Sequence, residues 1–337
     1  MPLPGRGAIA EQPFPLKALP LTGHPNEFVF AFSTLASSWA AYRHRPAAAG
    51  VELLKPADIT VDAVIGDHWA TSADGTRIPY HTMRLASEAS DGPRPTLLYA
   101  YGGFNVPLLP HYPPNAMAAF VAAGGVYVHA HLRGGAEFGR EWWQAGRMRK
   151  KQNCYADLYA VAEDLIASGV TTSDQLALTG GSNGGLLSGN ALTERPDLWK
   201  AVVPRVPLLD LIGACRDPYG RWAIVIELAD VEDPEEIRRL AGFSPYHLVQ
   251  DGLSYPAVFL DAGDTDPRCP PWHARKFAAR LQAAQAGDGP VLLHVWGNVG
   301  HGWATEKTIA LDQNTEWLAF VLKTLEMTPD ERARLSG

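Results

Sequence analysis

The stretch Gly180-Gly181-Ser182-Asn183-Gly184 constrains the fold of this chain more than any other segment. Residues 175–179 before it form a short apolar run typical of a buried strand, and residues 185–192 after it are typical of the start of a helix. A chain that passes from strand to helix so abruptly must turn sharply, and small residues tolerate the strained backbone that such a turn needs. The segment therefore predicts a serine on a tight turn above a sheet, although the five residues alone also fit an ordinary glycine-rich turn.

Strand-like and helix-like segments alternate beyond about residue 93. In residues 155–168, for example, Leu158, Val161 and Leu165 recur at helical spacing. The expected strands cover residues 95–101, 126–131, 200–206, 256–262 and 290–297, and the expected helices cover 115–123, 155–168, 271–284 and 305–325. This alternation predicts an α/β fold with a mostly parallel sheet and helices on both faces.

The first 60 residues have a different character, since they are irregular, rich in proline and strand-like. Residues 27–34 and 38–44 are expected to form two strands. Residues 61–72 and 77–85 flank Asp74-Gly75, a pair that favours the tight turn of a β-hairpin. We expect this hairpin to be the antiparallel edge of the sheet. The chain is therefore divided into a strand-rich segment, residues 1–60, and an α/β domain, residues 61–337.

Composition limits the partners that the chain can have. The 337 residues are 46% hydrophobic, carry a formal net charge of −7 and contain no long basic run, so nucleic acid is not an expected partner. The basic residues at 147–151 are expected to form a solvated loop. No apolar run reaches the roughly 18 residues of a membrane span. The three cysteines are too few for a disulfide framework, which favours a reducing, cytoplasmic location.

No metal or cofactor is predicted. His129 and His131 share one face of an expected strand, but the sequence offers no third ligand near them.

An activated serine needs a base and an acid that orients the base, and α/β-hydrolases place them in the chain order Ser, Asp, His. Three aspartates follow the strand that ends near residue 260: Asp261, Asp264 and Asp266. Asp261 is closest to the strand and is expected to be partly structural. Between the other two we favour Asp266, because a glycine three residues before it and Arg268 after it are usual for this loop in such enzymes.

The base that fits this order is His301, which lies in Gly300-His301-Gly302 after the strand at 290–297. Flanking glycines let an imidazole approach the serine closely. Two donors are also needed for the oxyanion of a tetrahedral intermediate. One is expected to be the backbone N–H of Asn183, and the other should come from the loop Tyr101-Gly102-Gly103-Phe104-Asn105, which follows an early strand.

Five motifs occur in an order that resembles the catalytic domain of the prolyl oligopeptidase family of serine peptidases over about residues 60–325. They are Tyr101–Asn105, Arg133–Gly139, Lys151–Cys154, Gly180–Gly185 and Asp266–Arg268. The resemblance implies an α/β-hydrolase fold and a catalytic triad of Ser182, Asp266 and His301.

The same resemblance implies roles for further residues. Tyr101 would donate its hydroxyl to the oxyanion beside the Asn183 N–H, and Arg268 would hold a backbone carbonyl of the bound peptide. The primary specificity pocket would be lined by Phe104, Leu208, Phe243 and Cys269.

The sequence departs from the family pattern in two places. The family's proline-stacking tryptophan would fall near Arg239, where no tryptophan stands between Ala223 and Phe243. The segment before about residue 56 resembles the end of a β-propeller and is too short to close one.

These features predict a serine peptidase that cleaves short peptides through an acyl-enzyme. Two alternatives remain: a carboxylesterase acting on small acyl or aryl esters, and a folded but catalytically idle remnant. Strands in the N-terminal segment would expose unpaired edges, through which the protein could form a homo-oligomer.

Overall fold

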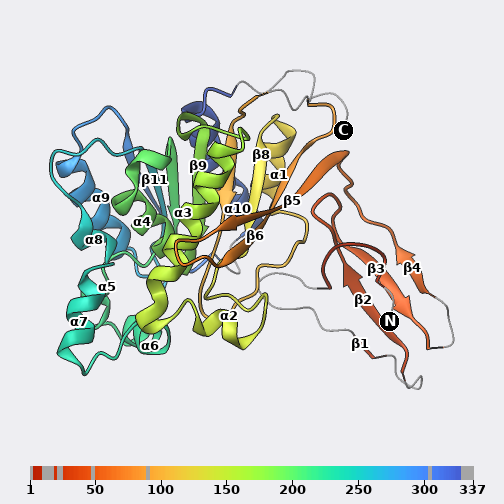
Figure 1. The fold of residues 1–337 in the computed structure, drawn as a ribbon, viewed down its shortest axis with the longest axis horizontal. Coiled ribbons are helices and arrows are strands. Elements are labelled where there is room, and N and C mark those ends of the chain that lie inside the picture. Colours follow the sequence, from red (N-terminus) through yellow and green to blue (C-terminus); the bar gives the residue numbers. More distant parts are fainter. Residues whose placement is uncertain are drawn as a thin grey trace.

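The structure is a computed structural model that describes residues 3–9, 19–20, 26–46, 50–88, 92–302 and 306–327. An eight-stranded sheet lies at the centre of its larger part (Figure 1). In spatial order its strands are β12 (Val291–Trp296), β11 (Ala257–Gly263), β10 (Ala201–Arg205), β9 (Leu176–Gly181), β7 (Thr96–Tyr99), β8 (Val126–Ala130), β6 (Arg77–Leu85) and β5 (Ala63–Thr71). Pairing is parallel from β12 to β8 and antiparallel from β8 to β5. The predicted sheet with a hairpin at its antiparallel edge is confirmed.

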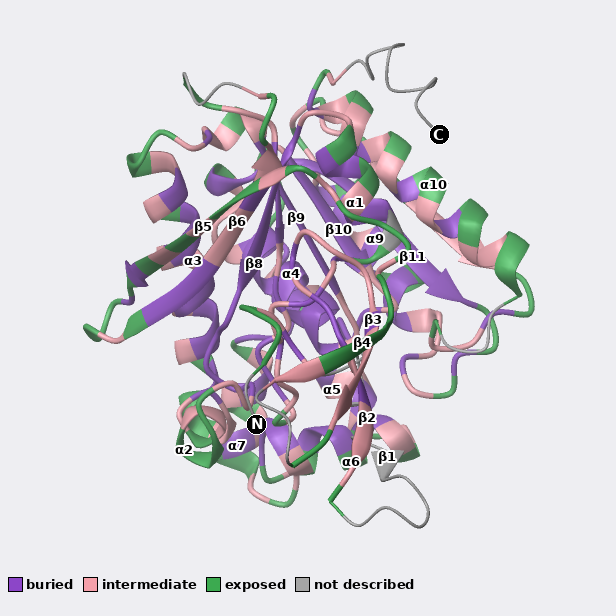
Figure 2. Ribbon diagram, turned by 90° about the vertical axis from the view of Figure 1, so that its right-hand side faces the viewer, coloured by how far each residue is buried: buried purple, intermediate pink, exposed green. Residues whose placement is uncertain are grey.

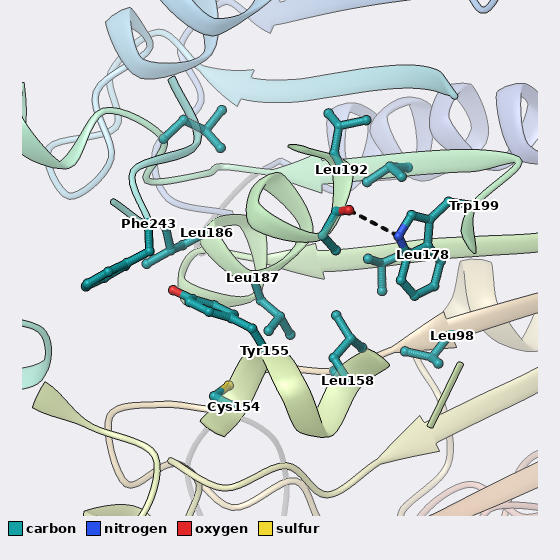
Figure 3. Close-up of a cluster of buried hydrophobic side chains, with 14 of the residues drawn as sticks. Leu98, Cys154, Tyr155, Leu158, Leu178, Leu186, Leu187, Leu192, Trp199 and Phe243 are labelled. Carbon is teal, nitrogen blue, oxygen red and sulfur yellow. Dashed lines mark hydrogen bonds between the residues drawn. The ribbon is translucent and has the colours of Figure 1, made fainter. Parts of the chain in front are cut away.

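Helices cover both faces of this sheet because successive residues of its central strands bury apolar side chains on opposite sides. Leu98 and Leu178 face one side, which is covered by α3 (Lys151–Ala167), α4 (Asn183–Glu194) and α9 (Trp272–Ala284). Figure 3 shows part of this cluster between α3 and α4. Leu97 and Ala177 face the other side, which is covered by α1 (Asn115–Ala122) and α10 (Lys307–Thr324). Figure 2 shows the central strands β8 to β11 as buried, and the outer surface of α10 as partly exposed.

A second, four-stranded antiparallel sheet lies beside the large one (Figure 1). Its strands follow chain order: β1 (Leu19–Pro20), β2 (Phe28–Phe32), β3 (Ala40–His44) and β4 (Val51–Lys55). The sequence predicts two of these strands, β2 and β3, and predicts neither β1 nor β4. Leu35, in the turn after β2, is buried in the same cluster as α1 and α10, and so it joins the small sheet to the main core.

The segment between β10 and β11 contains four short helices that the sequence analysis did not predict: α5 (Leu211–Ala214), α6 (Pro218–Glu227), α7 (Pro234–Ala241) and α8 (Pro245–Leu248). The last three begin with proline directly after Asp217, Asp233 or Ser244. The two aspartates cap their helices by accepting a backbone N–H, and proline suits the first helical position. A further short helix, α2 (Arg140–Gln144), precedes α3.

No helix in the described part of the chain has the length and apolar character that crossing a lipid bilayer requires.

Candidate active site

Ser182 lies on a strained turn between β9 and α4. Its backbone has φ 59° and ψ −114°, in the left-handed half of the map that side chains normally avoid. The turn can be this tight because two positions have no side chain. A Cβ on Gly180 would lie 2.4 Å from Gly184 O, and a Cβ on Gly184 would lie 2.8 Å from Ala100 O. The Ser182 N–H donates to Arg205 O at 2.9 Å, which ties the turn to β10.

The structure brings Ser182, His301 and Asp266 together from three loops. His301 Nε2 lies 3.0 Å from Ser182 Oγ, and His301 Nδ1 lies 2.6 Å from Asp266 Oδ2. The loops that carry the histidine and the aspartate are also joined, because Thr265 N–H donates to Val299 O at 3.1 Å. A carboxylate accepts the Nδ1 proton, and this tautomer leaves Nε2 free to accept the serine proton.

Of the three candidate aspartates, Asp266 contacts the histidine. Its side chain is fully buried, and its second oxygen accepts the backbone N–H groups of Arg268 at 2.8 Å and Cys269 at 3.0 Å. These bonds fix the carboxylate so that its other oxygen points at the imidazole. Asp261 instead pairs with Arg205 Nε at 2.9 Å, and Asp264 is exposed.

Both residues expected to supply the oxyanion donors line the same pocket as the serine. Tyr101 follows β7 and lines the same pocket as Ser182. Burial raises the pKa of the Tyr101 phenol, so the hydroxyl keeps its proton and can donate. Asn183 is the first residue of α4, where backbone N–H groups have no partner within the helix. Its side chain donates from Nδ2 to Tyr101 O, so the two donor segments contact each other.

A pocket of about 360 Å³ opens at Ser182. Of the residues expected to line it, Phe104, Leu208, Arg268 and Cys269 do so. Burial raises the pKa of the Cys269 thiol, which therefore stays protonated at neutral pH. Residues in the wall that the sequence analysis did not identify are Asn105, Val106, Trp143, Tyr219, Trp222, Ala223 and Ile226.

Phe243 is not among the lining residues, so the expectation that it lines the pocket is wrong. Its side chain is 1% exposed and lies in the main core, with its ring centroid 6.2 Å from that of Tyr155. The physical reason is local: Phe243 lies in the short turn between α7 and α8, and its side chain is buried in the core there. Arg239, near which the family pattern places a tryptophan, covers the Phe243 ring, with its Cζ 5.3 Å from the ring centroid.

Two indoles from other segments line the pocket instead. Trp143 belongs to α2, and Trp222 lies in α6 and is 51% exposed. Trp143 Nε1 donates to Glu227 Oε2 at 3.0 Å. Tyr219, also in α6, accepts a hydrogen bond from Arg268 Nε at 2.7 Å. The signal that could have found α6 is Asp217 followed by proline, a typical helix start.

The basic stretch 147–151 is not wholly solvated, because Lys151 is 1% exposed and lies behind the serine turn. Among the described residues, no three His, Cys, Asp or Glu side chains are placed to hold a metal ion.

Comparison with known proteins gives a consistent match. Residues 110–328 fit the model described as the prolyl oligopeptidase family. The chain is 46% identical over 215 residues to an uncharacterized peptidase of Sinorhizobium fredii, covering 64% of this chain and 29% of that protein. It is 39% identical over 254 residues to a prolyl endopeptidase of Elizabethkingia miricola, covering 75% of this chain and 36% of that protein.

A solved structure from a study of two prolyl endopeptidases superposes with a TM-score of 0.89 at 35% identity, over 97% of this chain and 47% of that one. Oligopeptidase B from Leishmania major superposes with a TM-score of 0.84 at 26% identity, over 89% of this chain and 43% of that one. The chain thus spans about a third of the length of these curated relatives and under half of the solved chains.

Proposed function

Because the chain belongs to the prolyl oligopeptidase family, we propose that it is a serine peptidase that cleaves short peptides through an acyl-enzyme. The observation that carries this proposal is the continuous hydrogen-bonded series from Asp266 through His301 to Ser182 at the mouth of an apolar pocket. Serine alone is a weak nucleophile, and a positioned imidazole is what activates it.

In this mechanism Ser182 Oγ attacks the scissile carbonyl carbon while His301 Nε2 takes the hydroxyl proton. Asp266 holds the imidazole in the required tautomer and stabilises the positive charge that forms on it. The carbonyl oxygen becomes an oxyanion that accepts from the Tyr101 hydroxyl and the Asn183 N–H. His301 then gives its proton to the leaving amine, and a water molecule, deprotonated by the same base, releases the acyl group from Ser182.

The pocket indicates which residue precedes the cut bond. Its volume, about 360 Å³, and its aromatic walls suit a compact apolar side chain, and the indoles of Trp143 and Trp222 supply apolar wall against which a proline ring could pack. Arg268, oriented by its bond to Tyr219, would donate to a backbone carbonyl of the peptide. We therefore propose that proline or a residue of similar size and polarity is accepted at this position.

The test compares peptide amides with peptide esters that share one acyl part, each with proline, alanine or lysine before the cut bond. The proposed peptidase should hydrolyse both the amides and the esters. It should cleave faster after proline or alanine than after lysine. Hydrolysis of esters alone would favour a carboxylesterase, and hydrolysis of neither would favour an idle protein. The Ser182→Ala variant sets the background rate, and a preference for lysine would contradict the pocket assignment.

A further inference from the structure

A buried ion pair lies directly behind the proposed oxyanion site. Lys151, the first residue of α3, and Glu227, the last residue of α6, have side chains that are 1% and 0% exposed. Lys151 Nζ lies 3.2 Å from Glu227 Oε1. Withdrawing two charges from water costs several kcal/mol for each, so such a pair adds little to stability over apolar side chains of similar size.

The other hydrogen bonds of the lysine reach both segments that carry the proposed oxyanion donors. Nζ donates to Gly102 O at 3.0 Å and to Asn183 Oδ1 at 3.3 Å. Gly102 directly follows Tyr101, and the Asn183 side chain donates in turn to Tyr101 O. An ammonium group has three protons, and here all three have acceptors. One cation therefore joins the loop after β7 to the start of α4.

The glutamate connects the same cation to the pocket wall. Glu227 Oε2 accepts the Trp143 Nε1 proton at 3.0 Å, while the Arg147 guanidinium covers the face of that indole at 4.3 Å. The edge of the indole is thus fixed by Glu227 and one of its faces by Arg147. Trp143 lines the pocket, so the position of this wall depends on the buried carboxylate.

We propose that Lys151 and Glu227 are positioning residues: Lys151 sets the Tyr101 hydroxyl and the Asn183 N–H relative to each other, and Glu227 fixes both the lysine and the Trp143 indole. Neither residue is among those that line the pocket, and the inference rests on the proposed function. Its physical basis is that oxyanion donors act only at the right distance, so that a shift of about 1 Å costs on the order of 100-fold in rate.

The test uses the double variant Lys151→Met/Glu227→Gln, which removes both charges together and leaves no lone buried ion. We expect kcat per active site for a peptide anilide to fall about 100-fold. The melting temperature should change little, because the buried pair adds little to stability. Complete labelling with a fluorophosphonate counts the active sites, so that loss of folded protein is not mistaken for loss of rate. Tyr159→Phe is the matched control, because it removes a hydrogen bond from the same helix to Glu194, away from the pocket.

A peptide aldehyde separates positioning from simple structural damage. Its adduct with Ser182 places an oxygen at the oxyanion site, so its affinity should fall together with kcat, while the affinity of the matching product peptide should change much less. Asn183→Ala repeats this measurement with both charges of the ion pair kept, since it preserves the backbone N–H and removes the side-chain links to Lys151 and to Tyr101.

Three results would overturn the inference. In the first, the double variant keeps kcat per active site within about threefold of the wild type. In the second, the affinities for the aldehyde and for the product peptide fall equally in the double variant. If the double variant does not fold, the same comparison is made in Asn183→Ala. In the third, the wild type neither labels nor hydrolyses the anilide, a result that would remove the proposed function itself.

Discussion

Replacing Tyr101 with phenylalanine tests the proposed oxyanion site with the smallest possible change. The variant removes one oxygen and keeps the ring that lines the pocket. It also keeps the Tyr101 carbonyl, which accepts from Asn183 and so holds the turn. Because burial raises the pKa of this phenol, the wild-type hydroxyl is protonated at every pH at which the enzyme would work.

The expected loss follows from the number of donors. One of two proposed donors to the oxyanion disappears, which corresponds to about 3–4 kcal/mol of transition-state stabilisation and a fall in kcat of roughly 10²–10³. KM should change little, since the ground-state carbonyl is bound less tightly at this site than the oxyanion.

Steady-state kinetics of the wild type and of Tyr101→Phe on one peptide anilide separates the effect on kcat from the effect on KM. Tyr80→Phe is the control. Tyr80 lies in β6, outside the pocket, and the variant removes a phenol oxygen that donates a hydrogen bond to Asp164 at 2.5 Å. It should lower stability and leave kcat unchanged. A Tyr101→Phe enzyme with wild-type kcat, or one affected mainly in KM, would refute the assignment of Tyr101.

Two further predictions concern buried titratable groups. Bulky thiol reagents should react slowly with Cys269 at neutral pH, because burial raises its pKa, and should abolish peptide hydrolysis once attached, because the thiol lines the pocket. Mass spectrometry with parallel rate measurements checks this, Cys269→Ala should resist the reagent, and full activity of the modified wild type would count against it. Burial, with repulsion from His81, lowers the pKa of His131 from 6.5 to about 4. The unfolded chain then binds this proton more readily, so the free energy of unfolding is greatest above about pH 6.5 and declines toward pH 4, by up to about 3 kcal/mol from this residue. Urea unfolding of His131→Gln across that range should show a shallower decline, and an unchanged decline would contradict the assignment.

Much of the fold could be predicted from local patterns in the sequence. The strand before Ser182, β9, is buried on both faces, so it stands out as a continuous apolar run, and the glycines at 180 and 184 mark the turn from this strand to α4. His301 and Asp266 follow strands in the order that brings loop ends to one edge of a parallel sheet. Both residues can therefore be identified from the sequence alone.

The pocket wall could not be predicted in the same way. Trp143 and Trp222 come from short helices in separate parts of the chain, and no periodicity shows which side of such a helix faces the serine. Phe243 was misplaced for the same reason, because alignment to a family motif gives sequence position and not the direction of packing.

Lys151 shows a different limit of sequence reasoning. It stands at the end of a basic run and was therefore expected in solvent, but its acceptors come from residues 102, 183 and 227. Only the folded chain brings these three together. A lysine that is buried for such long-range reasons leaves no local signal in the sequence.

The most direct test of the central claim is to map the site of fluorophosphonate labelling and to measure its rate. An activated serine should give one labelled peptide, containing Ser182, and His301→Gln should slow the reaction by on the order of 10³ or more, since the base that takes the hydroxyl proton is gone. The melting temperature of the variant shows whether it is folded. Labelling at another residue, or a rate that does not depend on His301, would contradict the account.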